Sequence, residues 1–259
     1  MTSAPPPVRI AMWSGPRNIS TALMRSFENR GDCVVADEPL YGYYLEATGI
    51  EHPGAEAIMD SMDCDWRSVA EALCSRLPGW PAETPPRVFY QKHMAQHLLP
   101  AVDLAFTDDL QNCFLIRDPG RIIASYARVR PEFSLAELGF QRQWELFQRV
   151  ADRLGHAPPV IDSAQTLRAP RSTLAALCAA VGIPFTERML HWPAGGRDSD
   201  GVWAPHWYAA VEASTGFEAP PAEDDDVLAS LAPRYRPLYE EAARYYADMS
   251  CHLLSAANS

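Results

Sequence analysis

The sequence predicts an α/β fold in a single domain, with a central parallel sheet and helices on both of its faces. Short apolar runs of the length of buried strands occur at residues 8–13, 33–36, 88–90, 112–116 and 160–161. Segments with the apolar spacing of helices alternate with them, at residues 20–30, 122–128, 136–154 and 174–181. This alternation is typical of a parallel sheet that is covered on both faces. The 259 residues, 47% of them hydrophobic, are enough for one large core.

The first strand and the first helix have the clearest boundaries. The apolar run at residues 8–13 is followed by Gly15 and Pro16, which turn the chain. A helix is expected from residue 20 to residue 30, where Gly31 ends it. One face of this helix carries the apolar residues Leu23, Met24 and Phe27. We therefore expect that face to pack on the sheet.

The later part of the chain contains one well-marked helix and one long irregular stretch. Ser172 and Thr173 precede the apolar stripe of residues 174–181, and Gly182 follows it, as expected for the two ends of a helix. Residues 191–221 are rich in Gly, Pro, Asp and Trp and are too long for a simple connection. We expect them to form a binding loop or a lid.

The beginning of the chain suggests neither export nor a membrane anchor. Residues 1–7 form a Pro-rich lead that we expect to be disordered, ahead of one domain over residues 8–259. This lead has no basic and apolar signal pattern, and no later run reaches the roughly 18 apolar residues of a membrane span. A soluble, cytoplasmic protein without a membrane partner is expected.

Charge and cysteine usage narrow the classes of ligand. The formal net charge of −11 disfavours a nucleic-acid partner, because phosphate neutralisation needs a basic face. The six cysteines have no zinc-ligand spacing, so we expect reduced thiols and no metal. An anionic ligand must then be held by individual arginines. The oligomeric state stays open, with a homodimer as one option.

A candidate anion site lies in the turn between the first strand and the first helix. Backbone N–H groups and the helix dipole converge at such a turn and suit a phosphate, and Ser20 and Thr21 add hydroxyl donors. The Walker pattern GxxxxGK[ST] is not met, since Ile19 precedes Ser20 and the turn has no lysine. By itself the turn is equally consistent with Ser20 as a helix cap and Arg17 as a solvated residue.

Residues 16–21, Pro-Arg-Asn-Ile-Ser-Thr, resemble the phosphosulfate loop P-K-S-G-T-T of sulfotransferases that use 3′-phosphoadenosine 5′-phosphosulfate (PAPS). The sequence departs from that loop at Ile19, in place of glycine, and at Arg17, in place of lysine. The resemblance implies a P-loop-type sheet and binding of the 5′-phosphosulfate by the loop residues, which are Arg17, Asn18, Ile19, Ser20 and Thr21. Arg17 keeps a permanent cation that can stabilise charge on the departing oxygen.

A second phosphate site is suggested by Arg117 and Ser125. Residues 117–125 resemble the 3′-phosphate motif R-x-P-x-x-x-x-x-S of the same family, with Arg117 and Ser125 at the matching positions. Arg117 ends a strand and Ser125 lies early on the next helix, so both can reach one phosphate. The plain alternative is an Arg117–Asp118 pair beside an unremarkable helix residue, and it weakens because both motifs occur in family order.

Two residues are candidates for the base that removes the acceptor proton. Residues 91–100 resemble the stretch K-T-H-x-x-x-x-L-L-P of cytosolic sulfotransferases, which places the catalytic histidine at His93. Gln91 and Lys92 stand in place of the lysine and the threonine of that stretch. Glu38 is the rival, because Glu38-Pro39 resembles the E-P element of carbohydrate and bacterial sulfotransferases. We rank His93 narrowly above Glu38 and expect His97 to be an ordinary packed or surface histidine.

The late loop and the tyrosines offer further candidates. Residues 195–207 are similar in composition to the family loop R-K-G-x-x-G-x-W, which closes over the nucleotide, so Arg197 is a candidate for the 3′-phosphate. Nearby aromatic residues can stack on adenine, line the acceptor site or belong to the core: Trp203, Trp207 and Tyr208. Tyr41, Tyr43 and Tyr44 are consistent with an aromatic pocket for a small acceptor or with ordinary packing.

The resemblance covers about residues 8–207 and implies a sulfotransferase that moves a sulfuryl group from PAPS to a hydroxyl or amine of a small molecule. Because ligands bind outside the carboxyl ends of parallel strands, the candidate residues should converge on one cleft. Two alternatives stay open: a P-loop kinase-like phosphotransferase, and a non-catalytic binder of 3′-phosphoadenosine nucleotides. The missing Gly-Lys pair of the loop disfavours the kinase.

Overall fold

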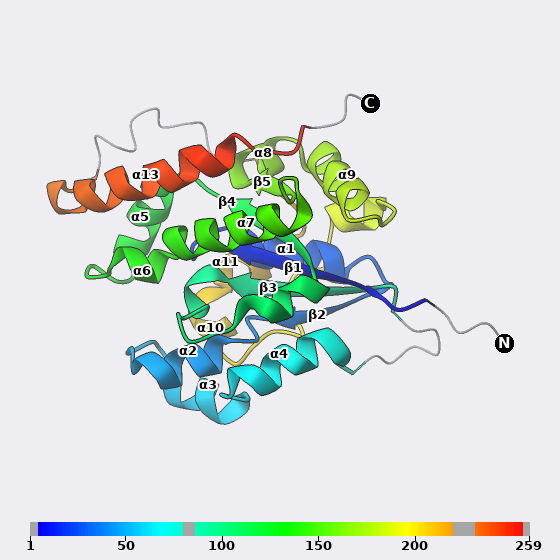
Figure 1. Cartoon of the computed structure of the whole chain (residues 1–259), viewed down its shortest axis with the longest axis horizontal. Coiled ribbons are helices and arrows are strands. Elements are labelled where there is room, and N and C mark those ends of the chain that lie inside the picture. The colour runs from blue at the N-terminus through cyan, green and yellow to red at the C-terminus, as the bar shows by residue number, and fades with distance from the viewer. Residues whose placement is uncertain (1–4, 80–85, 220–230, 256–259) are drawn as a thin grey trace.

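The sheet has the order β2-β3-β1-β4-β5, and every neighbouring pair of strands is parallel (Figure 1). The computed structural model describes residues 5–79, 86–219 and 231–255. Within these residues the strands are β1 (Val8–Ser14), β2 (Cys33–Asp37), β3 (Val88–Met94), β4 (Gln111–Ile116) and β5 (Val160–Asp162). The predicted parallel α/β sheet is confirmed. β1 lies at its centre, so the turn after β1 opens in the middle of the sheet edge.

Helices cover both faces of this sheet (Figure 1). The longer ones are α1 (Ser20–Glu28), α2 (Tyr41–Thr48), α3 (Ala55–Ser61), α4 (Trp66–Ser75), α5 (Pro119–Ala127), α7 (Phe140–Leu154), α9 (Pro170–Ala180) and α13 (Arg236–Ser250). The short ones are α6 (Leu135–Leu138), α8 (Ser163–Arg168), α10 (Ala204–Trp207), α11 (Ala209–Ala213) and the 3-10 turns η1 (Ala95–His97), η2 (Leu104–Asp109), η3 (Glu187–Leu190) and η4 (Pro233–Tyr235).

The side chains of each strand alternate between two apolar cores. One core joins α1 and α9 to residues such as Met12, Tyr90 and Leu115. The other joins α4, α7 and α13 to the intervening residues, such as Trp13 and Phe89. Because successive strand residues point to opposite faces, each strand is buried on both sides.

Two expectations need correction. The helix expected at residues 136–154 is two helices, α6 and α7, because Gly139 takes a left-handed conformation (φ 72°) between them. Residues 191–221 are less irregular than expected, since α10 and α11 form within them; residues 220–221 lie outside the described part. Of the lead, residues 1–4 also lie outside it, and residues 5–7 form no helix or strand.

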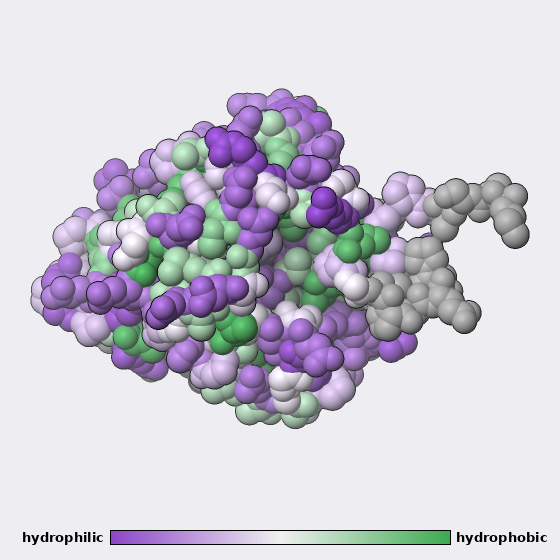
Figure 2. Space-filling view, turned by 90° about the horizontal axis from the view of Figure 1, so that it is seen from below, coloured by the Kyte–Doolittle hydropathy of each residue, from purple (hydrophilic) through white to green (hydrophobic). Residues whose placement is uncertain are grey.

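The surface gives few clues to a partner. Figure 2 shows hydrophilic and hydrophobic residues intermixed on the face seen from below. The large hydrophobic residues exposed within the described ranges are Val129, Leu154 and Val202, which belong to separate segments. No helix in the described part is long and apolar enough to span a bilayer.

Phe27 provides a test of the α1 packing. Its side chain is fully buried and stacks on Tyr90, with ring centroids 4.2 Å apart. We expect Phe27→Ala to lower the free energy of unfolding by about 3–5 kcal/mol in urea titrations. Val129→Ala, at an exposed position, should change it by less than about 0.5 kcal/mol. Equal effects of the two substitutions would contradict the packing.

Candidate functional site

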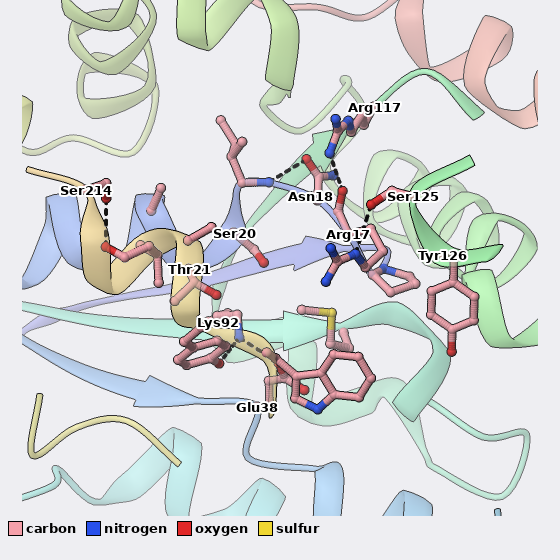
Figure 3. Close-up of a pocket in the computed structure, with 18 of the residues that line it drawn as sticks. Arg17, Asn18, Ser20, Thr21, Glu38, Lys92, Arg117, Ser125, Tyr126 and Ser214 are labelled. Carbon is pink, nitrogen blue, oxygen red and sulfur yellow. Dashed lines mark hydrogen bonds and ion pairs between the residues drawn. The ribbon is translucent and has the colours of Figure 1, made fainter. Parts of the chain in front are cut away.

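A cavity of about 440 Å³ opens at the carboxyl ends of the strands (Figure 3). The loop after β1 lines it with residues 16–22, and Glu38 follows β2. Lys92 comes from β3 and Arg117 follows β4. Separate segments therefore meet at the edge where open parallel sheets bind ligands.

The loop after β1 is held in an unusual conformation. Arg17 has a positive φ of 55°, which is uncommon for a residue with a side chain. Asn18 secures the loop, because its Nδ2 donates to the carbonyl of Leu115 (3.3 Å) and its Oδ1 accepts from Ile19 N (2.9 Å) and from Ser163 Oγ. The N-cap residue of α1 is Ile19, whose apolar side chain cannot accept a hydrogen bond from the first N–H groups of the helix. The first N–H groups of α1 are thus placed to bind an anion.

The residues of the two predicted phosphate sites contact each other directly. Arg17 Nε donates to Ser125 Oγ (3.0 Å), and Arg117 Nη1 donates to the carbonyl of Arg17. Figure 3 shows these three residues on the same side of the cavity. Burial, and then the neighbouring cations Arg121 and Arg17, lower the pKa of Arg117. A group whose charge is crowded in this way gains most from an anion.

A buried ionic cluster lies across the cavity from these arginines. Lys92, the only lysine of the sequence, donates through Nζ to Asp37 Oδ1 (2.8 Å), Glu38 Oε1 (2.6 Å) and the hydroxyl of Tyr208 (2.6 Å). The side chain of Lys92 is fully buried, and that of Glu38 is 10% exposed. Glu38 has a positive φ of 44°. We call Asp37, Glu38, Lys92 and Tyr208 the lysine cluster.

Charge within the lysine cluster favours a proton on Glu38. Burial raises the pKa of Glu38, and the Lys92 ammonium only partly opposes it. Burial alone would lower the pKa of Lys92, but the carboxylates of Asp37 and Glu38 outweigh it and raise that pKa well above its usual value. With both carboxylates ionised the cluster carries one net negative charge. Protonation of Glu38 removes that charge, so Glu38 is suited to accept a proton.

The late loop is fastened to the same cluster. The hydroxyl of Tyr208 donates to Asp37 Oδ2 (2.7 Å) and accepts from Trp203 Nε1 (3.0 Å). The backbone N–H of Gly201 also donates to Asp37 Oδ2 (3.2 Å). Arg197, in contrast, donates to the carbonyl of Gly196 (2.9 Å) and lies outside the described cavity lining. The structure does not bring Arg197 together with Arg117.

His93 also lies apart from Arg17 and Glu38. It stacks on Trp13, with ring centroids 4.1 Å apart, on the opposite side of the sheet from Lys92. Burial lowers the pKa of His93 to about 3, and the described cavity lining does not include it. The reason is the two-residue period of β3, which continues to Met94 instead of ending at residue 90.

Sequence reasoning missed several residues of the site, among them His97, Lys92 and Asp37. His97 lines the cavity, buried between Tyr41 and Tyr44, whose rings lie 4.8 and 4.7 Å from its own. The sequence motifs give no role to Lys92, which lines the cavity, or to Asp37, which accepts a hydrogen bond from Lys92 Nζ (2.8 Å). Trp13 of β1 pairs with His93 of β3, and Met12 pairs with Lys92. Because successive strand residues point to opposite faces, the strand period is the signal that places Lys92 and His93 on opposite faces of the sheet.

Known proteins show the same fold and family. The family model described as a sulfotransferase domain matches residues 8–242. The fold resembles the sulfotransferase domain of the olefin synthase from Synechococcus PCC 7002, with a TM-score of 0.56, 19% identity and coverage of 95% of this chain and 96% of that one. It also resembles a sulfotransferase from Alicyclobacillus acidocaldarius, with a TM-score of 0.52, 12% identity and coverage of 98% and 99%.

Two curated relatives come from Arabidopsis thaliana. Branched-chain-amino-acid aminotransferase-like protein 1 is 34% identical over 257 residues, which are 96% of this chain and 44% of the relative. Branched-chain-amino-acid aminotransferase-like protein 2 is 34% identical over 236 residues, which are 88% of this chain and 41% of the relative. The chain therefore spans less than half the length of these relatives.

Removal of Lys92 should destabilise the protein strongly and in a pH-dependent way. Lys92→Met leaves Asp37 and Glu38 buried without a cation, which costs about 3–5 kcal/mol. Burial raises the pKa of Glu38, and the substitution removes the Lys92 ammonium that opposes this, so the cost should be largest at pH 8 and smaller at pH 5, where a proton can neutralise Glu38. Urea titrations at the two pH values measure this.

The control for this prediction is an ion pair with partial exposure. Arg149 and Asp108 form it, with N–O distances of 2.6 and 3.2 Å. Arg149→Met should cost at most about 1 kcal/mol. A loss for Lys92→Met that is equally small, or that grows toward pH 5, would contradict the charge assignment.

Proposed function

This chain belongs to the sulfotransferase domain family, and on that premise we propose that it moves a sulfuryl group from PAPS to a hydroxyl or amine of a small molecule. One observation carries the proposal: Arg17 and Arg117, which contact each other, line one side of the cavity, and the buried carboxylate of Glu38 lines the opposite side. The cations suit the phosphates of the donor, and the carboxylate suits the acceptor proton.

The chain offers donors for both phosphate ends of PAPS. The N–H groups that begin α1, with the hydroxyls of Ser20 and Thr21, suit the 5′-phosphosulfate. Arg117 and Ser125 suit the 3′-phosphate. Arg17 lies between the two phosphate sites, because it belongs to the loop that leads into α1 and contacts both Ser125 and Arg117. The planar guanidinium of Arg17 can stabilise charge that grows on the bridging oxygen as the S–O bond breaks.

We assign the role of base to Glu38 and place it above His93. In the proposed step the acceptor oxygen or nitrogen forms a bond to sulfur, and the bond from sulfur to the phosphate oxygen breaks. The acceptor proton passes to Glu38, and adenosine 3′,5′-bisphosphate leaves. Lys92 and Asp37 remain a neutral pair throughout, so the lysine cluster loses its net charge when Glu38 takes the proton.

The names of the Arabidopsis relatives do not suggest a second activity for this chain. An aminotransferase needs a lysine amine that forms a Schiff base with pyridoxal phosphate. Asp37 and Glu38 keep Lys92, the only lysine of the sequence, in its charged form, which is not nucleophilic. The matched part of each relative is also less than half of its length.

Nucleotide binding separates the sulfotransferase from the kinase alternative. At about 100 times its Kd, adenosine 3′,5′-bisphosphate should raise Tm by roughly 5 °C or more, whereas ATP with magnesium should not. Arg117→Ala should abolish most of the rise, because it removes a half-buried cation of the cavity. Arg153→Ala, at an exposed position on α7, is the control. A rise in Tm with ATP and magnesium, together with none with adenosine 3′,5′-bisphosphate, would overturn the proposal.

Turnover tests the base and excludes the non-catalytic binder. We expect Glu38→Gln to lower kcat about 10²–10⁴-fold while the affinity for adenosine 3′,5′-bisphosphate is retained. His93→Gln should keep kcat within a few-fold, since His93 stacks in the core. Labelled sulfate from PAPS is the measurement. If Glu38→Gln remains active, the assignment of the base is wrong.

The pH profile gives a second readout of Glu38. Its pKa is raised by burial, and the base must be ionised to accept a proton. The acid limb of kcat/KM should therefore lie above the pKa of about 4.3 of an ordinary glutamate. A rate that stays flat through that limb down to pH 4 would contradict the role of Glu38.

A further inference from the structure

An aromatic chamber forms the part of the cavity that follows Glu38. We define the chamber by five rings that line the cavity: Tyr41, His52, His97, Tyr126 and Trp207. The backbone N–H of Tyr41 donates to the carbonyl of Glu38 (2.9 Å), so the chamber begins one helical turn from the proposed base. In Figure 3, Tyr126 lies on the side of Arg17 and Ser125, away from Ser20 and Thr21.

Ring contacts hold the chamber in shape. Tyr41 and His97 are stacked, with an angle of 9° between their planes. The hydroxyl of Tyr41 and Nδ1 of His52 are 2.8 Å apart, and the ring centroids of His52 and Trp207 lie 6.4 Å apart in a T-shaped arrangement. Rigid flat walls of this kind bind a ring of a ligand at a small cost in conformational entropy.

Polar atoms of the chamber lack partners among the described residues. They are Nε2 of His52, Nδ1 of His97 and Oε1 of the adjacent Gln96. His97 is 2% exposed, and a buried polar atom without a hydrogen bond costs about 1–3 kcal/mol. Native structures retain few such atoms, and each calls for an explanation. Because these atoms have almost no accessible surface, a bound molecule reaches them only if the side chains move.

The chamber is also electrically neutral at pH 7. Burial lowers the pKa of His52 to about 4 and the pKa of His97 well below its usual value, and it raises the pKa of Tyr126 to about 12. Outside the lysine cluster, the cation that acts on His52 is Arg130, which is paired with Glu137 (3.4 Å), whereas Arg17 also acts on Tyr126.

The cavity cations lie elsewhere. Arg17 and Arg117 belong to the donor side, and the charge of Lys92 is already neutralised by Asp37 and Glu38. At the His52 and His97 end of the chamber, a carboxylate would therefore be desolvated beside cations that already have partners. It would also lie near the negative lysine cluster.

We infer that the chamber binds the acceptor and selects an uncharged alcohol that carries a ring over the same molecule with an added carboxylate. This inference rests on the proposed function. The alcohol oxygen forms the new bond to sulfur, its proton passes to Glu38, and the sulfur–oxygen bond to the phosphate breaks. The ring lies against Tyr41 and Trp207.

A matched pair of alcohols tests the selection. With saturating PAPS, kcat/KM for 2-phenylethanol should exceed that for 4-(2-hydroxyethyl)benzoate at least about 100-fold. Calorimetry with each alcohol on the chain saturated with adenosine 3′,5′-bisphosphate should show the same order of affinity. A carboxylate that binds or reacts as well as the neutral alcohol overturns the inference, and so does a failure of both alcohols to bind.

A tryptophan pair locates the binding site. Trp207→Leu should raise KM for 2-phenylethanol about 10-fold. It should leave the Kd of adenosine 3′,5′-bisphosphate unchanged. Trp144→Leu, at a half-buried tryptophan that packs on Phe147 outside the cavity, should change neither constant. An unchanged KM in Trp207→Leu overturns the chamber assignment.

The two levels of proposal fail in different ways. If adenosine 3′,5′-bisphosphate does not bind the wild-type chain, the proposed function is wrong. If it binds and the alcohol preference is absent or reversed, the proposed function stands and only the chamber inference is wrong. Calorimetry with the two alcohols on the free chain tests the chamber without a donor.

Discussion

The ammonium of Lys92 is the interaction on which the candidate site depends. Strand pairing places Asp37 directly beside Lys92 at the ends of β2 and β3, and the next residue, Glu38, turns back to the same nitrogen. Tyr208 adds the late loop to this point. One buried cation thus joins two strands and a distant segment, and removing it would leave two carboxylates buried without a partner.

Backbone strain is concentrated at the residues that line the cavity. Among the residues that the structure describes, Arg17 and Glu38 are the non-glycine residues with positive φ. Each costs of order 1–3 kcal/mol and persists because its surroundings hold it. Asn18 and the Arg117 side chain hold the loop of Arg17, and Lys92 holds Glu38. Such strain is typical of sites where side chains must be aimed at a ligand.

The cavity separates charge into two regions. Guanidinium groups gather where β1 and β4 end, whereas the region beyond Glu38 has aromatic walls and neutral imidazoles. A donor with several phosphates and an acceptor without charge would each find complementary surroundings. The acidic net charge of the chain, −11, makes this local concentration of arginines more informative than the overall composition.

Local patterns in the sequence determined the α/β class and the turn after β1, because strand length, turn residues and helix periodicity act over a few residues. The pair Arg117 and Ser125 was proposed from the resemblance of residues 117–125 to a family motif. The direction of His93 depended on how far β3 extends, which neighbouring strands decide through pairing. The partners of Lys92, the position of Arg197 and the burial of His97 involve segments far apart in the chain. Only the tertiary structure decided these, since long-range packing and desolvation select which side chains meet.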